Sequence, residues 1–361
     1  MTIMAILAGM LLGALFQASE RAKEISTQAT INKLNSQLML RWESYRTRRL
    51  VIDPRQVLVT ALADYGIAAP STTNTKHLSL VRLRALRELM RMEIPDRYKD
   101  LHDAAWQPKA LVVGGTPVRP ALWYAYRQRI AQAQGLVSPT NAQIDNVLQG
   151  GTTPDIAATN QTAECLYLVV TMGTEDDSLR GDQTAPDVGD TDNDGMFEFL
   201  DAWGRPIEFF RWAPGFVSDM QPRFPDLTLD RDPFNHHDPF DVGYVDQHLV
   251  LSTSNAISVW NPIPAATPPY NAVCNQSSKN YYRGYALTPL IVSRGVDNDF
   301  GLFFGLSSGL VNPASNADIL LAEFDPYALY DDSSGTFYQR AEPLANNASF
   351  DNIHNHVLGS R

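Results

Sequence analysis

The first 50 residues carry one long helical pattern with two unlike halves. Residues 3–16 are uncharged and almost wholly apolar. Further along, apolar residues recur at spacings of three and four, which places them on one helical face: Ile31, Leu34, Leu38, Trp42 and Tyr45. No Gly or Pro interrupts residues 14–53, so the pattern predicts a single helix from Ile3 to about Leu50, with its apolar stripe packed on a sheet.

The middle of the chain also has helical periodicity. Leucines at helical spacing predict a helix over residues 78–99, and a second one is expected over 119–134, where Gly135 provides the stop. Residues 140–170 predict two more helices, the second covering Gln161–Thr171. Together they indicate a helical insert, for which a packing role is the simplest interpretation.

After Gly173 the sequence becomes rich in Gly, Pro, Asp and aromatic residues. Short runs of β-branched and aromatic residues predict strands at Ile207–Trp212, His248–Leu251 and Leu290–Ser293. Residues 261–270 are rich in proline and predict a loop.

These patterns predict an α+β fold in three parts. Residues 1–50 form the long N-terminal helix, residues 51–172 the helical insert, and residues 173–361 a β-rich head. The head is expected to hold a largely antiparallel β-sheet with long loops.

Composition limits the function classes. A hydrophobic share of 44% in 361 residues excludes a disordered chain, and a net charge of −11 argues against a general nucleic-acid binder. Residues 20–99 carry 15 Lys and Arg against 8 Asp and Glu, whereas residues 175–246 carry 5 against 18. Two cysteines are too few for a disulfide framework; Cys165 and Cys274 would form one bridge or remain two buried thiols.

Residues 190–201, DTDNDGMFEFLD, carry the clearest chemical signal. Acidic residues alternate into a glycine turn in the spacing of a calcium-binding loop, in which carboxylates converge on a hard cation that takes six to eight oxygens. The expected ligands are Asp190, Asp192, Asp194, the carbonyl of Met196, Glu198 and Asp201. The segment after this loop has the pattern of a strand, so a helix–loop–helix sensor is not expected. The alternative is a solvated acidic hairpin.

The N-terminal layout resembles the type IV pilin and type II secretion pseudopilin family, and TIMAILAGMLLGALFQASERAKE is similar to the middle and end of that family's apolar segment. Residues 201–209, DAWGRPIEF, resemble the Asp-Pro-Trp-Gly-Asn-Pro-Tyr segment of the major pseudopilin. Residues 289–301, PLIVSRGVDNDFG, resemble its C-terminal strand and loop, which holds calcium in the relatives. The resemblance therefore implies Asp297 and Asp299 as a second pair of candidate calcium ligands.

The resemblance implies a structural subunit of a secretion or pilus-like filament, not an enzyme. Its partners would be other pilin or pseudopilin subunits, membrane proteins of the secretion machine and the membrane, with calcium as cofactor and no nucleic acid. The expected location is the bacterial cytoplasmic membrane, in a single pass, with the head on the periplasmic or extracellular side.

The apolar run of residues 3–16 is shorter than the roughly 20 residues that span a bilayer. The family's basic leader and Phe-Thr-Leu-x-Glu start do not precede Thr2, so we expect either an earlier start codon or a subunit that has lost processing. The alternative function is a calcium-dependent cell-surface binding protein with a simple membrane anchor. An exported hydrolase is a weaker third, since no catalytic motif is present.

Overall fold

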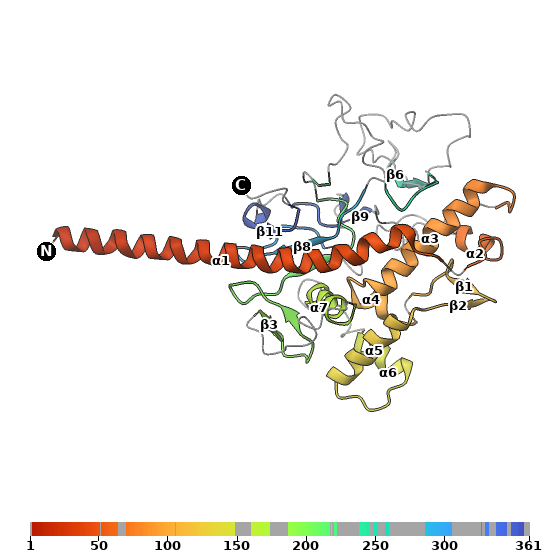
Figure 1. Ribbon diagram of the computed structural model, residues 1–361, viewed down its shortest axis with the longest axis horizontal. Helices are drawn as coiled ribbons and strands as arrows, with labels where there is room; N and C mark the ends of the chain where they lie inside the picture. Colours follow the sequence, from red (N-terminus) through yellow and green to blue (C-terminus); the bar gives the residue numbers. More distant parts are fainter. Residues whose placement is uncertain are drawn as a thin grey trace, which may run out of the picture.

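The structure is a computed structural model that describes residues 2–50, 52–63, 70–104, 106–148, 160–173, 187–216, 218, 220–221, 238–243, 245, 249–251, 257–259, 286–304, 326, 329–331, 337–344 and 348–356. Its described part is α+β, as predicted, with a long N-terminal helix that extends beyond the other described elements (Figure 1). The predicted loop at 261–270 and Cys274 lie outside the described residues.

The longest element, α1, runs without a break from Thr2 to Ser44 and continues into the 3₁₀ turn Tyr45–Thr47. This confirms the predicted continuous helix, which ends a few residues before the expected Leu50. The predicted stripe is buried, with each member at most 3% exposed: Ile31, Leu34, Leu38, Trp42 and Tyr45. It packs on strands β8 (Leu290–Ser293) and β11 (Ile353–His354) and on helix α7 (Gln161–Gly173).

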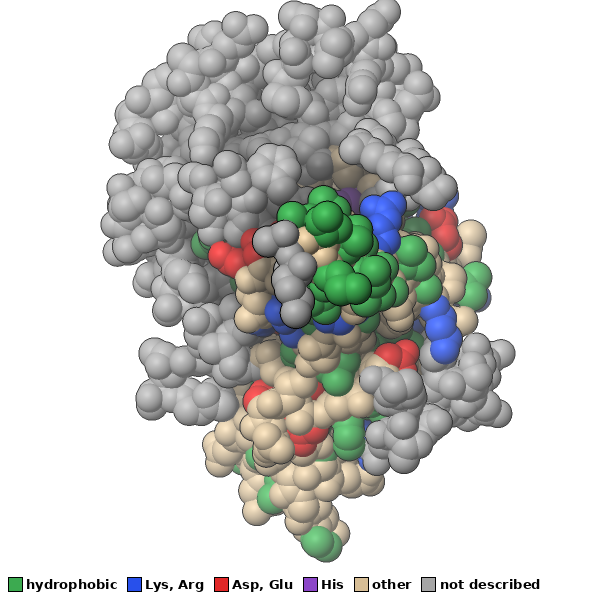
Figure 2. All heavy atoms as spheres, turned by 90° about the vertical axis from the view of Figure 1, so that its left-hand side faces the viewer, with side chains coloured by type: hydrophobic (Ala, Val, Ile, Leu, Met, Phe, Trp, Pro, Cys, Tyr) green, Lys and Arg blue, Asp and Glu red, His purple; other side chains and the backbone are tan. Residues whose placement is uncertain are grey.

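The first half of α1 is different, because its apolar side chains are exposed. Nine large apolar residues between positions 3 and 16 are each 57–77% exposed. Figure 2 looks toward this end of the helix and shows hydrophobic side chains gathered on it. Among the described residues, no helix is both long enough and apolar enough to cross a membrane.

Strands β5 (Glu208–Phe210), β8 and β11 form an antiparallel sheet in the order β11-β8-β5. Phe209 pairs with Ile291, and both join the core that contains the α1 stripe. The next pair, Phe210 and Leu290, belongs to a second cluster, because successive side chains in a strand point to opposite faces. The sheet is therefore covered on both faces.

The predicted strands all occur within the expected segments. Strand β8 has the predicted bounds, while the segment 207–212 contributes only β5 and the segment 248–251 contributes β6 (Leu249–Leu251). The remaining described strands form separate antiparallel pairs rather than one large sheet: β1 (Val112–Val113) with β2 (Thr116–Pro117), β3 (Val188–Gly189) with β4 (Glu198–Phe199), β6 with β7 (Ile257–Val259), and β9 (Leu329–Asp331) with β10 (Phe337–Gln339).

The insert is helical, as predicted, with these elements: α2 (Leu58–Ala63), α3 (Thr75–Glu93), α4 (Tyr98–Leu101), α5 (Ala121–Ala133), α6 (Asn141–Leu148) and α7. One prediction needs correction, because the segment 78–99 is not one helix. Helix α3 ends at Glu93, since Pro95 disfavours helical geometry in the residue before it. Its start is capped by the side chain of Asn74, which accepts the N–H of Lys76 at 3.0 Å.

A buried group of charges joins the insert to the β-rich part. Arg211, next to the end of β5, donates to Asp100 of α4 at 2.7 Å and lies 3.2 Å from Asp96. Arg340 donates to Asp96 at 2.6 Å, and Arg91 of α3 bonds Asp100. Burial opposes ionisation of Asp100, but the neighbouring Arg211 and Arg91 hold the pKa of its carboxyl well below the ordinary value.

The α1 stripe should carry much of the stability. Leu34→Ala removes a side chain that is 2% exposed, so we expect the free energy of unfolding of the full chain in detergent to fall by about 2–5 kcal/mol. Leu40→Ala is the matched control, because Leu40 lies on the same helix and is 72% exposed; it should change stability by less than about 0.5 kcal/mol. Equal losses in both variants, measured by urea unfolding, would contradict the docking of this face.

Candidate metal site at the acidic segment

The acidic segment forms a tight turn between strands β3 and β4. The carboxylate of Asp190 accepts the backbone N–H groups of Asp194 at 3.1 Å and Gly195 at 3.0 Å. Asp194 in turn accepts the N–H of Met196 at 2.8 Å. Gly195 has φ +89°, in the left-handed region that favours glycine. The sharp turn predicted at this glycine is present.

Two groups of carboxylates converge here. The ligand oxygens of Asp190, Asp192 and Asp194 lie within 4.8 Å of one another, and so do those of Glu164, Asp192 and Glu198. Asp192 belongs to both groups. The structure thus brings together four of the acidic residues expected from the sequence and adds one, Glu164 of α7, that the loop pattern could not include.

Asp201 belongs to neither group. Asp201 accepts the backbone N–H groups of Trp203 at 2.9 Å and Arg205 at 3.0 Å, and the hydroxyl of Ser293 at 2.7 Å. Its carboxylate thereby fixes the turn after β4 and ties that turn to β8. The side chain of Met196 is buried in the core, at 3% exposed.

The second pair of candidates, Asp297 and Asp299, lies in the turn after β8. Asp297 accepts the N–H of Asp299 at 2.8 Å, and Asp299 accepts that of Gly301 at 3.0 Å. Asp351 bonds the N–H of Asp297 at 3.0 Å. Within the described part of the chain, neither residue belongs to a group of three converging carboxylates.

Glu164 is fully buried, as is Glu198, but the two carboxyl groups differ in their hydrogen bonds. Tyr98 donates its hydroxyl to the Oε2 atom of Glu164, while the Oε1 atom has no hydrogen-bond partner among the described residues. Burial, followed by the charges of Asp194, Asp192 and Glu198, raises the pKa of Glu164 to about 10. These described neighbours therefore disfavour the ionised form of the carboxyl rather than stabilise it.

Glu198 belongs to the same group of carboxylates and accepts more hydrogen bonds than Glu164. Its carboxylate accepts the N–H of Thr191 at 3.1 Å and the amide of Asn160 at 3.4 Å. Burial still raises the pKa of Glu198 to about 7. Burial also raises the pKa of Glu208, which accepts a hydrogen bond from Thr162, to about 8.

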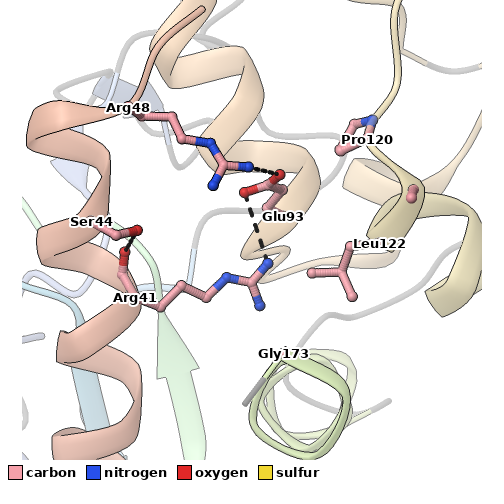
Figure 3. A pocket seen from close by; sticks show the side chains of 8 residues that line it. Arg41, Ser44, Arg48, Glu93, Pro120, Leu122 and Gly173 are labelled. Carbon is pink, nitrogen blue, oxygen red and sulfur yellow. Dashed lines mark hydrogen bonds and ion pairs between the residues drawn. The ribbon is translucent and has the colours of Figure 1, made fainter. Parts of the chain in front are cut away.

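A pocket of about 570 Å³ lies where α1 meets α3, α5 and α7. Figure 3 shows Arg41 of α1, and Arg48 just after the 3₁₀ turn, reaching toward Glu93 of α3. Arg48 donates to Glu93 at 3.0 Å, Tyr45 donates to it at 2.7 Å, and Arg41 lies 3.9 Å away. Because the Glu93 carboxylate pairs with both arginines, this pocket lies at a polar contact between the N-terminal helical segment and the insert.

Other residues with reactive or metal-binding side chains are hydrogen-bonded, ion-paired or buried. Cys165 is a buried free thiol, and burial raises its pKa well above the ordinary value. Asp238 forms an ion pair with Arg87 at 2.9 Å, and Asp241 accepts the N–H of Val245 at 3.0 Å. These last two contacts hold Asp238, Asp241 and Val245 in place.

Comparison of the chain with protein-family models, with curated proteins and with solved structures found no match. Function is therefore inferred from the geometry of the molecule and from the resemblance of its motifs.

In metal-free protein, the free energy of unfolding should fall as the pH rises from about 7 to 9. Folded Glu164 and Glu208 keep their protons up to pH values of about 10 and about 8, whereas both carboxyls lose them near their ordinary pKa of about 4.5 in the unfolded chain. The unfolded state thus binds fewer protons in this window. Burial lowers the pKa values of His354 and His356 to about 4, so both are neutral in the folded protein here.

Urea unfolding in chelator at several pH values measures this slope. Glu164→Gln should flatten it, because glutamine does not titrate. Stability that increases toward pH 9 would contradict the assigned burial of these carboxyls.

Proposed function

We propose that this protein is a membrane-anchored, pilin-like structural subunit, in which α1 joins neighbouring subunits and a calcium ion stabilises the head. The observation that carries the proposal is the division of α1. Its first half is apolar and extends free of the described head, while its second half is docked (Figures 1 and 2).

The exposed half requires a non-aqueous partner on energetic grounds. Fully burying one large apolar side chain is worth about 1.5–3 kcal/mol, and nine such residues between positions 3 and 16 are more than half exposed. Their combined transfer is on the order of 10 kcal/mol, as large as the whole stability of an ordinary domain. Their apolar side chains point in all directions around the helix axis, which is typical of a helix buried in lipid or in a bundle.

Polar contacts fix the point at which the free half begins. Trp203, in the segment that resembles the pseudopilin signature, donates its indole N–H to Glu20 at 2.8 Å. The backbone N–H of Ala202 bonds the hydroxyl of Thr27 at 3.0 Å. Gln28 donates to the carbonyl of His354 at 3.3 Å. These bonds couple the head to α1 from Glu20 onward, so that an anchored helix would carry the head in a fixed orientation.

Gly9 and Gly13 favour a bundle over a lone anchor. They are four residues apart and therefore lie on one face of α1, where a Cβ added to either would meet nothing within 4 Å in the described structure. A small-residue face of this kind allows a second helix to approach closely in lipid. The alternative, a calcium-dependent surface binding protein with a simple anchor, requires no such contact.

Photo-crosslinking in bacterial membranes separates the two functions. A photoreactive residue at Leu12, which is 69% exposed, should give an adduct with a second copy or with another subunit bearing an apolar N-terminal helix. Sequencing the crosslinked peptide by mass spectrometry identifies the partner. The same residue at Val137, which is 91% exposed on the insert, is the control and should not produce that adduct.

The predicted adduct should decrease at least several-fold when Gly9→Leu and Gly13→Leu are introduced together, because the added side chains keep the helices apart. A Leu12 probe that yields only lipid adducts would contradict assembly and favour the simple anchor.

A further inference from the structure

The buried carboxylate of Glu164 belongs to the group of converging carboxylates that also contains Asp192 and Glu198. Its Oε1 atom is unpartnered within the described part of the chain although the residue is fully buried, and a buried polar atom without a partner is destabilising. The hydroxyl of Tyr98 bonds the other oxygen. That bond supplies a donor to Oε2 and leaves Oε1 without one.

Three separate elements deliver oxygens to the same point. Glu164 comes from α7, Asp192 from the turn and Glu198 from β4, and their ligand oxygens lie within 4.8 Å of one another. All three are carboxylates, and no described His or Cys belongs to the group. Such hard oxygen ligands select calcium or magnesium rather than zinc or copper. Calcium accepts more ligands in less regular geometry than magnesium and so fits a site assembled from three elements.

We propose that Glu164, Asp192 and Glu198 bind one calcium ion, which fastens the acidic turn to helix α7. The inference deepens the calcium component of the proposed function and is independent of filament assembly. It replaces the linear calcium loop expected from the sequence with a site whose decisive ligand lies outside that loop.

Asp190 and Asp194, the remaining acidic residues of the turn, stabilise its backbone. The carboxylates of Asp190 and Asp194 accept backbone N–H groups within the turn, so they shape it whether or not an ion is present. The ion would add a long-range link instead. Helix α7 packs on α1 and on β5, and Tyr167 of α7 contacts the ring of Phe199 of β4, with centroids 5.3 Å apart. A calcium ion at this place would stabilise the core around the docked half of α1.

Thermal unfolding of the full chain in detergent, in calcium and in chelator, tests the site. Wild type should melt about 4 °C higher in saturating calcium, the shift expected when the ion is present at about a hundredfold excess over its Kd. Glu164→Gln should abolish the shift, and it should raise the melting temperature in chelator, because it removes a buried ionisable group. Glu208→Gln is the matched control: Glu208 is also fully buried and contacts α7 through Thr162, but it lies outside the carboxylate group. This variant should keep the shift.

Calcium titration calorimetry on Asp190→Asn gives a second test that does not depend on the folding of the Glu164 variant. The composite site predicts binding within about tenfold of wild type, whereas a linear loop predicts its loss, because Asp190 is the first ligand of that pattern. Magnesium in place of calcium should give a smaller shift. The inference is overturned if wild type shows no calcium-dependent shift, or if Glu164→Gln keeps it while Asp190→Asn loses binding. Crosslinking at Leu12 in chelator reports assembly separately, so the two proposals fail independently.

Discussion

The burial of one face of α1 is the contact on which the rest of the structure depends. The stripe from Ile31 to Tyr45 contacts the β8–β11 edge of the sheet, helix α7 and the insert. Trp42 packs edge-on against Phe240, with ring centroids 5.4 Å apart, and Tyr45 bonds Glu93. The sheet and the insert both pack on this second half of α1. The described head covers only the second half of α1, so the apolar first half is exposed.

Two sets of carboxylates differ in how the protein balances their charge. Asp96 and Asp100 each lie beside at least two arginines, so their negative charge is balanced by the protein itself. Glu164 is in the opposite situation, since its charged neighbours in the cluster are Asp192 and Glu198. The proposed calcium ion would balance the charge of this group, at the place where α7 packs on α1.

The sequence predicted what short-range patterns determine. Unbroken periodicity at three and four residues located α1 and its buried stripe, and a β-branched run located β8 with its bounds. The predicted helix over 78–99 failed because Pro95 outweighed the leucine periodicity. The single sheet expected after residue 173 is divided among small ladders in the described part, since strand pairing depends on partners far apart in the sequence. Only the local part of the candidate site could be predicted, because its remaining ligand is far away in the sequence. Alternating acids and a glycine located the turn, but Glu164 reaches it only through the packing of α7 on β4. A signal was present, because Glu164 is the only charged residue in the helix QTAECLYLVVTMG.

The central claim is that α1 has two environments, protein for its second half and a helix bundle or lipid for its first. Hydrogen exchange of the full chain in bilayers, followed by mass spectrometry, tests it directly, because backbone amides of a helix exchange slowly only when the helix is held in place. We expect residues 3–16 to be protected in bilayers to a degree comparable with residues 31–45. Rapid exchange of residues 3–16 beside a protected second half would contradict it.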